Sequence, residues 1–202
     1  QHQTISYRAQ YLQLLVQQLL KHQAELLYLL NLEAAKTLED ALGEWREAID
    51  LCQYYAQQAQ LLQSTQSLPH ITGEENLLTL VPRGVFLCIS PWNFPLAIFI
   101  GQIAAAVVTG NTVIAKPAND TPLIAQRVLD LWLEAGLPKN IVQLVFANSH
   151  DLGDILFKHE LLAGVVFTGS TATAQHINQT LAARQGAIIP LIAETGGLNA
   201  MI

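Results

Sequence analysis

Hydrophobic residues in the first third of the chain recur at the spacing of helices. Between residues 5 and 66, apolar side chains return every three or four positions with Gln, Lys and Glu between them, which predicts helices. A second helix is expected to begin at Thr37, because residues 37–40 resemble a capping box with an acidic first turn. The apolar pattern of the first predicted helix consists of Leu12, Leu15, Val16, Leu19, Leu20, Leu26, Leu27 and Leu30.

The rest of the chain alternates between short apolar runs and longer amphipathic segments. Residues 64–76 are rich in Ser, Thr, Pro, His and Gly and are expected to form a linker or an irregular crossing. We predict strands at residues 77–81, 85–90, 112–115, 141–146, 164–168 and 190–193. We predict helices at residues 95–108, 122–135, 152–157 and 171–184.

Apolar strands that alternate with helices indicate a parallel sheet covered on both faces. Right-handed crossovers then give an α/β fold with a Rossmann-like, doubly wound sheet. The sequence therefore predicts an N-terminal helical segment at residues 1–66 and an incomplete Rossmann-like domain at residues 67–202. The chain begins with Gln1 rather than Met and ends at Ile202 in an apolar run, so we expect a fragment of a longer protein.

Composition narrows the classes of partner. The net charge is −6 and no cluster of Lys and Arg stands out, which argues against a nucleic-acid partner for this segment. Two cysteines and six scattered histidines form neither a disulfide framework nor a metal-ligand spacing, so we expect a reduced cytoplasmic protein without a metal. The longest apolar run, residues 94–108, is too short to span a bilayer.

Candidate chemistry gathers where the predicted strands end. Ligands of doubly wound sheets bind beyond the carboxyl ends of the strands. Four such ends carry unusual residues, namely Pro-Trp-Asn-Phe-Pro at 91–95, Lys-Pro-Ala at 116–118, Thr-Gly-Ser-Thr at 168–171 and Glu-Thr-Gly-Gly at 194–197. We expect all four to lie on the ligand side of the sheet.

Each of these ends has a chemical and an ordinary interpretation. Asn93, between two prolines, is either a pre-positioned oxyanion donor or a turn-forming residue. Lys116 either donates to ribose hydroxyls or phosphate, or is a surface lysine whose ammonium reaches solvent.

The residues at the other two strand ends also allow two interpretations each when taken alone. Gly169 and Ser170 begin a helix, where free N–H groups either bind phosphate or form an ordinary N-cap. Glu194 is either a general base with a tuned pKa or a capping acid. Gly196 and Gly197 suit a close backbone approach or a positive φ.

In this order the motifs resemble the aldehyde dehydrogenase superfamily. The matching stretches are residues 36–38, 45–48, 91–95, 110–118, 121–123, 167–171 and 194–197. The amino-acid sequence of residues 88–99 and 190–202 resembles one branch of that family, the glutamate semialdehyde (1-pyrroline-5-carboxylate) dehydrogenase module of bifunctional proline utilization A.

The resemblance implies a mechanism in which a cysteine thiolate attacks an aldehyde and hydride passes to NAD. By matched position Asn93 would hold the oxyanion and Glu194 would activate water for hydrolysis of the thioester. The nucleophilic cysteine would lie beyond Ile202, so we expect this piece alone to be inactive. The residues implied at the cofactor are Ile89, Ser90, Pro91, Trp92, Lys116, Ala118, Asn119, Gly153, Phe167, Thr168, Gly169 and Ser170.

Two positions depart from the family pattern. Asn119 stands where the family commonly has a Glu that binds the adenine ribose, which leaves the choice between NAD and NADP open. Cys52 and Cys88 match no catalytic position, so we interpret both as inert core thiols. Any FAD is expected only in a separate proline dehydrogenase domain, and the full-length protein is expected to be a homo-oligomer acting on a small aldehyde.

Other classes fit less well. A nucleotide-binding pseudoenzyme or interaction module without catalysis is the main alternative. A short-chain reductase needs Tyr with Lys four residues later, but Tyr54 and Tyr55 are followed there by Gln58 and Ala59. No G-x-S-x-G elbow or Walker A loop occurs in the sequence.

Overall fold

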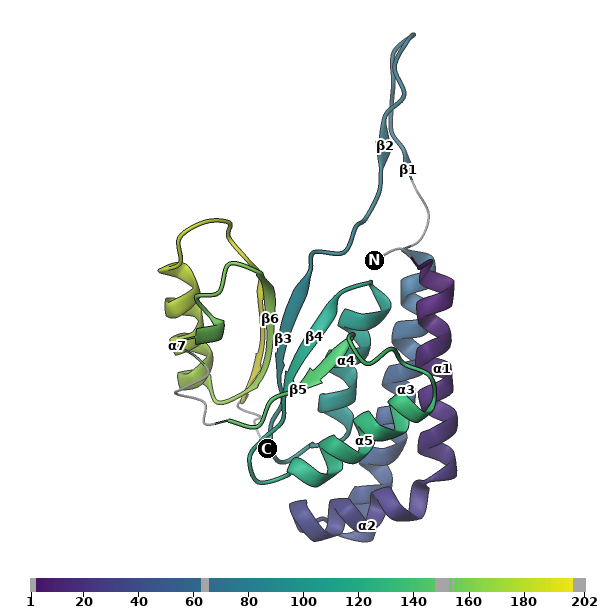
Figure 1. The fold of residues 1–202 in the computed structure, drawn as a ribbon, viewed down its shortest axis with the longest axis vertical. Coiled ribbons are helices and arrows are strands. Elements are labelled where there is room, and N and C mark those ends of the chain that lie inside the picture. The colour runs from purple at the N-terminus through teal and green to yellow at the C-terminus, as the bar shows by residue number, and fades with distance from the viewer. Residues whose placement is uncertain (1–2, 63–65, 148–152, 154, 198–202) are drawn as a thin grey trace, which may run out of the picture.

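Five parallel strands form the centre of the computed structural model, which describes residues 3–62, 66–147, 153 and 155–197 (Figure 1). Their spatial order is β5-β4-β3-β6-β7. The chain runs outward from β3 through β4 to β5 and then returns to β6 on the other side, so the topology reverses between β3 and β6. The predicted doubly wound α/β fold is confirmed. The strands are β3 (Val85–Ile89), β4 (Thr112–Lys116), β5 (Val142–Leu144), β6 (Leu162–Gly169) and β7 (Leu191–Thr195).

Helices cover the two faces of this sheet unequally (Figure 1). Helices α4 (Ala97–Val108) and α5 (Pro122–Glu134) pack on one face and α7 (Thr171–Ala182) on the other. Alternate residues of β3 enter the two cores that result, because successive strand side chains point to opposite faces. Phe86 and Cys88 join the larger core, and Leu87 joins the smaller one.

Three N-terminal helices pack outside α4 and α5 and extend the larger core. They are α1 (Ile5–Lys21), α2 (Gln23–Ala34) and α3 (Leu38–Leu61). Helix α3 begins after Thr37, whose hydroxyl accepts a hydrogen bond from the Asp40 N–H at 3.1 Å, as the capping pattern predicts. The larger core contains residues from both sides of residue 66, and the division into two parts at that residue stays a prediction.

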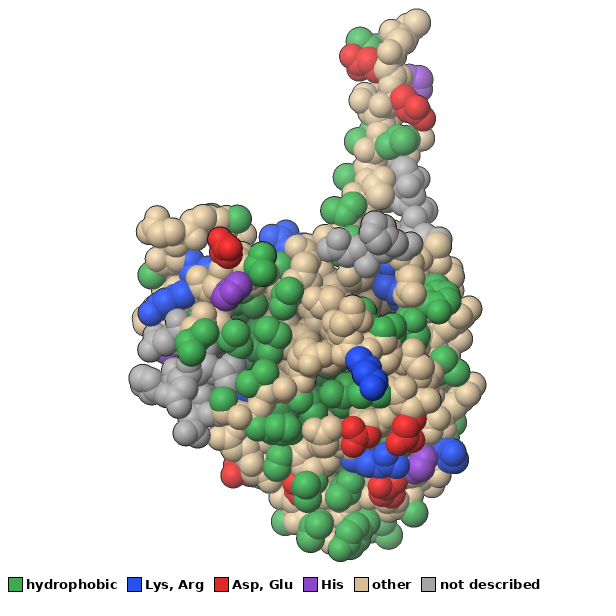
Figure 2. Space-filling model, viewed as in Figure 1, with side chains coloured by type: hydrophobic (Ala, Val, Ile, Leu, Met, Phe, Trp, Pro, Cys, Tyr) green, Lys and Arg blue, Asp and Glu red, His purple; other side chains and the backbone are tan. Residues whose placement is uncertain are grey.

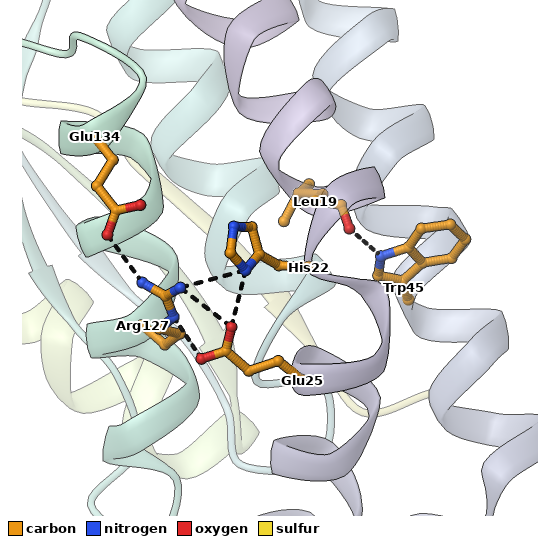
Figure 3. Close-up of polar contacts among 6 residues, drawn as sticks. All are labelled: Leu19, His22, Glu25, Trp45, Arg127 and Glu134. Atoms are coloured by element: carbon orange, nitrogen blue, oxygen red, sulfur yellow. Dashed lines mark hydrogen bonds and ion pairs between the residues drawn. The ribbon is translucent and has the colours of Figure 1, made fainter.

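The first predicted helix is in fact two helices that meet at His22. The apolar pattern runs on through this residue, but its backbone leaves the helical region at φ −104° and ψ 22°. His22 Nδ1 lies 3.0 Å from Glu25 Oε2 and 3.4 Å from Arg127 Nη2 (Figure 3). Arg127 also binds Glu25 and Glu134, so the junction is tied to α5 by contacts that helical periodicity does not encode.

The strand predicted at residues 77–81 does not join the sheet. Instead β2 (Leu77–Leu78) pairs antiparallel with β1 (Gln66–Ser67), and this hairpin projects from the body (Figures 1 and 2). Leu77 is 52% exposed, so its hydrophobicity does not reflect burial in this chain. The predicted linker at 64–76 therefore contains a strand, and residues 64 and 65 lie outside the described part.

Two further predictions need correction or restriction. The apolar composition of β7 predicts a strand covered on both faces, but β7 is an edge strand with β6 as its neighbour, and Ile192 is 52% exposed. Of the short helix predicted at 152–157, residues 152 and 154 lie outside the described part, whereas Gly153, Ile155 and Leu156 are helical. None of the helices within the described ranges combines the length and hydropathy needed to cross a membrane.

Candidate functional site

A cleft of about 790 Å³ lies at the carboxyl ends of the strands, over the point where the topology reverses. All the predicted site residues except Gly153 line it. They are Ile89, Ser90, Pro91, Trp92, Asn93, Lys116, Ala118, Asn119, Phe167, Thr168, Gly169, Ser170 and Glu194. Gly153 lines an adjoining pocket of about 430 Å³ that shares Ile89, Lys116, Phe167 and Thr173 with the cleft.

Lys116 ends β4 between the cleft and the adjoining pocket. The residue is only 5% exposed, so it is not a surface lysine. Its ammonium donates to the Pro117 carbonyl at 3.2 Å and reaches Asn119 Oδ1 at 3.5 Å. Burial lowers the pKa of Lys116, and no carboxylate of the described residues pairs with it. The ammonium has three N–H donors, so an anion or hydroxyl group in the cleft would accept from the remaining one.

The loop between β3 and α4 carries Asn93 along the wall of the cleft. Pro95 is buried and anchors the end of this loop, whereas Asn93 is exposed and Trp92 is 57% exposed. No hydrogen bond from another described residue engages the Asn93 amide. The side chain is therefore free to donate to a group bound in the cleft.

Ser170 forms the N-cap of α7 and lines the same cleft as Asn93 and Lys116. Its hydroxyl accepts a hydrogen bond from the Thr173 N–H at 3.2 Å and lies 2.8 Å from Thr173 Oγ1. The ordinary N-cap interpretation therefore holds, while the same residue still lines the cleft. Gly169 has a packing reason of its own, because a Cβ there would lie 2.6 Å from the Phe167 ring.

Glu194 lies near the end of β7, opposite Thr168 on β6. Its side chain is exposed and lines the same cleft as Asn93. Neither Gly196 nor Gly197 has a positive φ, so that alternative was wrong. A Cβ on either would meet no described atom within 4 Å, and a close approach of the backbone to a bound group stays a prediction. Four strand ends that are far apart in sequence thus supply one cleft.

The adjoining pocket is mainly apolar. Leu87 and Ile89 from the sheet, Phe157, and Ile177 from α7 line it beside Gly153. His176 also lines this pocket, although no motif in the sequence selects it. A flat, weakly polar ring is the kind of group that such walls accommodate.

Comparison with known proteins now identifies the family. A sequence model of the "Aldehyde dehydrogenase family" matches residues 1–202. The chain belongs to the aldehyde dehydrogenase family. It is 46% identical over 181 residues to the bifunctional protein PutA of Escherichia coli K12, covering 88% of this chain and 13% of that protein. It is 38% identical over 185 residues to a 1-pyrroline-5-carboxylate dehydrogenase of Staphylococcus aureus, covering 90% of this chain and 36% of the relative.

Solved structures agree with the sequence relatives. A proline utilization A variant from Bradyrhizobium japonicum superposes with a TM-score of 0.93 at 50% identity, covering 97% of this chain and 20% of the other. A 1-pyrroline-5-carboxylate dehydrogenase from Thermus, solved with bound NAD, superposes with a TM-score of 0.92 at 32% identity, covering 96% of this chain and 39% of the other. This aldehyde dehydrogenase chain therefore spans well under half the length of these relatives.

Gln102 is a residue of this aldehyde dehydrogenase chain that sequence reasoning missed. It lies in the apolar helix α4, where the sequence pattern shows it only as an interruption of a hydrophobic run. Its amide donates to the Ile89 carbonyl at 3.2 Å and to Thr168 Oγ1 at 3.0 Å. These bonds join the ends of β3 and β6, whose residues Ile89 and Thr168 line the cleft. A single buried amide in an apolar helix was the available signal.

Neither cysteine of the chain can act as the dehydrogenase nucleophile in this fold. Cys52 packs in the helical core, and Cys88 lies in the middle of β3. Burial raises the pKa of both thiols to about 12, so the nucleophilic thiolate is absent at neutral pH. The expectation of two inert core thiols is confirmed.

The buried thiols predict a loss of stability at high pH. Both groups remain neutral in the folded chain up to about pH 12, whereas unfolded thiols ionise from about pH 8.5 upward. Below about pH 8.5 the thiols are neutral in both states, so their contribution to the free energy of unfolding is fully present. Above about pH 8.5 the free energy of unfolding falls by about 1.4 kcal/mol per pH unit for each thiol. Urea titrations of the chain between pH 8 and pH 11 measure this slope.

A variant with Cys52→Ala and Cys88→Ala serves as the control for this slope. It should be less stable at neutral pH because both sites are buried, yet its free energy of unfolding should fall less steeply with pH. Equal slopes in the two proteins would show that the thiols ionise as readily in the folded chain as in the unfolded one.

Proposed function

We propose that this chain is the cofactor-binding part of an NAD-dependent aldehyde dehydrogenase that oxidises L-glutamate γ-semialdehyde, formed from 1-pyrroline-5-carboxylate, to L-glutamate. The observation that carries the proposal is that Asn93, Lys116, Ser170 and Glu194 line one cleft although they come from four separate strand ends. The similarity to PutA and to 1-pyrroline-5-carboxylate dehydrogenases supports the substrate.

The residues of the cleft suit a dinucleotide. The buried ammonium of Lys116 has oxygen atoms of its own loop as partners and would donate to ribose hydroxyls. The first N–H groups of α7 after Ser170 suit a pyrophosphate. The apolar pocket around Gly153 and Phe157 suits an adenine ring. When bound, NAD accepts the hydride removed from the aldehyde carbon.

Asn93 and Glu194 would perform the steps that belong to this chain. The Asn93 amide would donate to the carbonyl oxygen as negative charge develops on it. The Glu194 carboxylate would take a proton from water during hydrolysis of the acyl group. The nucleophilic cysteine would lie beyond Ile202, since Cys52 and Cys88 are buried and protonated. We therefore propose that residues 1–202 alone do not turn over.

The test uses the full-length protein that carries this chain, with residues 1–202 as the comparison. Absorbance at 340 nm should show reduction of NAD with L-glutamate γ-semialdehyde by the full-length protein and none by residues 1–202. NADP in place of NAD measures the effect of Asn119, where the family commonly has a carboxylate. Tight NAD binding without turnover in the full-length protein would contradict the enzyme and support a nucleotide-binding module.

A further inference from the structure

Helices α4 and α5 are each capped by a carboxylate from one of the N-terminal helices. Neither helix has a side-chain N-cap of its own, at Leu96 or at Thr121. Glu44 of α3 fills this role for α4, because its Oε1 accepts hydrogen bonds from Leu96 N at 2.7 Å and Ala97 N at 3.1 Å. The free N–H groups at a helix start need such partners when they are buried.

Helix α5 is capped in the same manner by the end of α2. Glu33 Oε1 accepts from Leu123 N at 2.8 Å, and Glu33 Oε2 accepts from Ile124 N at 2.8 Å. The hydroxyl of Thr121, which occupies the ordinary capping position, is buried without a hydrogen-bond partner in the described part of the chain. The Glu33 carboxylate therefore accepts the N–H groups that Thr121 does not cap.

The Glu44 contact is part of a larger cluster with Lys36 and Phe94. The Glu44 side chain is fully buried, and its Oε2 lies 2.9 Å from Lys36 Nζ. The same ammonium stands 4.2 Å from the centre of the Phe94 ring, one residue beyond Asn93. Lys36 and Glu44 thus hold both the end of the β3–α4 loop and the start of the helix after it.

We propose that Glu44 and Glu33 are positioning residues for the candidate active site. Glu44 fixes the β3–α4 loop that carries Asn93, and Glu33 fixes the β4–α5 loop that carries Ala118 and Asn119. The assignment rests on the proposed function for its kinetic consequences, whereas the contacts stand without it. Each loop ends at a helix start that would lose its partner if the carboxylate were removed, and a displacement of about 1 Å at a reacting group can cost about 100-fold in rate.

The two carboxylates also decide where a phosphate can bind. The N-terminus of a helix attracts anions, but those of α4 and α5 already hold Glu44 and Glu33. The start of α7 is capped by its own Ser170, whose hydroxyl is uncharged. Of these three helix starts, α7 is the one at which a second anion meets no resident carboxylate.

Variants of the full-length protein separate the two roles. E44A should lower kcat about tenfold while the Kd of NAD stays within about twofold, because the start of α4 loses its acceptor and the displaced loop carries the oxyanion donor. E33Q should raise the Kd of NAD about fivefold while kcat at saturating NAD stays within about twofold, because the displaced loop faces the cofactor. D50A, at an exposed carboxylate on the same helix as Glu44, is the matched control and should match the wild type.

Calorimetric titration with NAD, steady-state kinetics and amide hydrogen exchange give three independent readouts. Faster exchange in E44A should appear at Leu96 and Ala97, and in E33Q at Leu123 and Ile124. If the wild type binds NAD but does not turn over, the proposed function fails, and the exchange pattern together with the E33Q Kd still tests this inference. Unchanged exchange at those amides, or equal losses in kcat and NAD affinity for both variants, would overturn it.

Discussion

Replacing Asn93 by alanine in the full-length protein should lower kcat about 100- to 1000-fold, the usual cost of removing one oxyanion donor. Asn93 lines the cleft together with Glu194, and no described residue occupies its amide. The amide contacts the carbonyl oxygen most strongly when negative charge has developed, so kcat should fall more than affinity for NAD. Steady-state kinetics and calorimetric NAD binding measure the two effects separately.

Asn140→Ala is the matched control for the oxyanion donor. Asn140 is exposed and precedes β5, so it lies at the amino ends of the strands, across the sheet from the cleft. Its replacement should leave kcat within about twofold of the wild type, as surface substitutions commonly do. If the Asn93→Ala enzyme had the same kcat as this control, Asn93 would have no role in the reaction.

The alternating half of the chain could be predicted from its sequence because its determinants are local. The apolar strand residues of β3 and β4, the proline that opens α5 at Pro122 and the serine cap of α7 at Ser170 each act within a few positions. Once the strands are parallel, their carboxyl ends must share one edge, which brings Asn93 and Lys116 into one cleft. The site followed from topology rather than from any single motif.

The features that the sequence could not predict depend on distant partners. The break between α1 and α2 is held by Arg127, which lies 105 residues beyond His22. The caps of α4 and α5 come from carboxylates 52 and 90 residues away from the amides they bind. The apolar run at 77–81 has the composition of a buried strand, yet β2 pairs with β1 away from the sheet. An apolar pattern predicts that a segment is buried, but it does not predict which element packs against that segment.

These long-range contacts give the N-terminal helices a role beyond extending the larger core. The Rossmann-like half supplies the residues of the cleft, but the starts of its helices α4 and α5 depend on Glu44 and Glu33 from the helical segment. A division of the chain at residue 66 by composition would therefore separate two helices from their caps. We expect the chain without residues 1–62 to lose the geometry of the cleft along with part of its core.

Replacing Glu194 by glutamine should lower steady-state turnover of the full-length protein about 100- to 10,000-fold, the range for loss of a general acid or base. The amide keeps the shape of the side chain but cannot accept a proton from water. Hydride transfer precedes hydrolysis of the acyl group in the proposed mechanism, so the first turnover should still reduce NAD. Stopped-flow absorbance at 340 nm should show a burst of about one NADH per site and then a slow steady rate.

The burst distinguishes Glu194 from Asn93, because the two residues line the same cleft but would serve different steps. Asn93→Ala should slow the burst itself, whereas Glu194→Gln should slow only the later turnovers. Glu160→Gln provides the control, since Glu160 is exposed and precedes β6 at the opposite edge of the sheet. Loss of the burst in Glu194→Gln, with NAD affinity retained, would place this carboxylate before hydride transfer. The inference that Glu194 is a general base because it lies at a strand end would then be wrong, although the fold and the cleft would be unchanged.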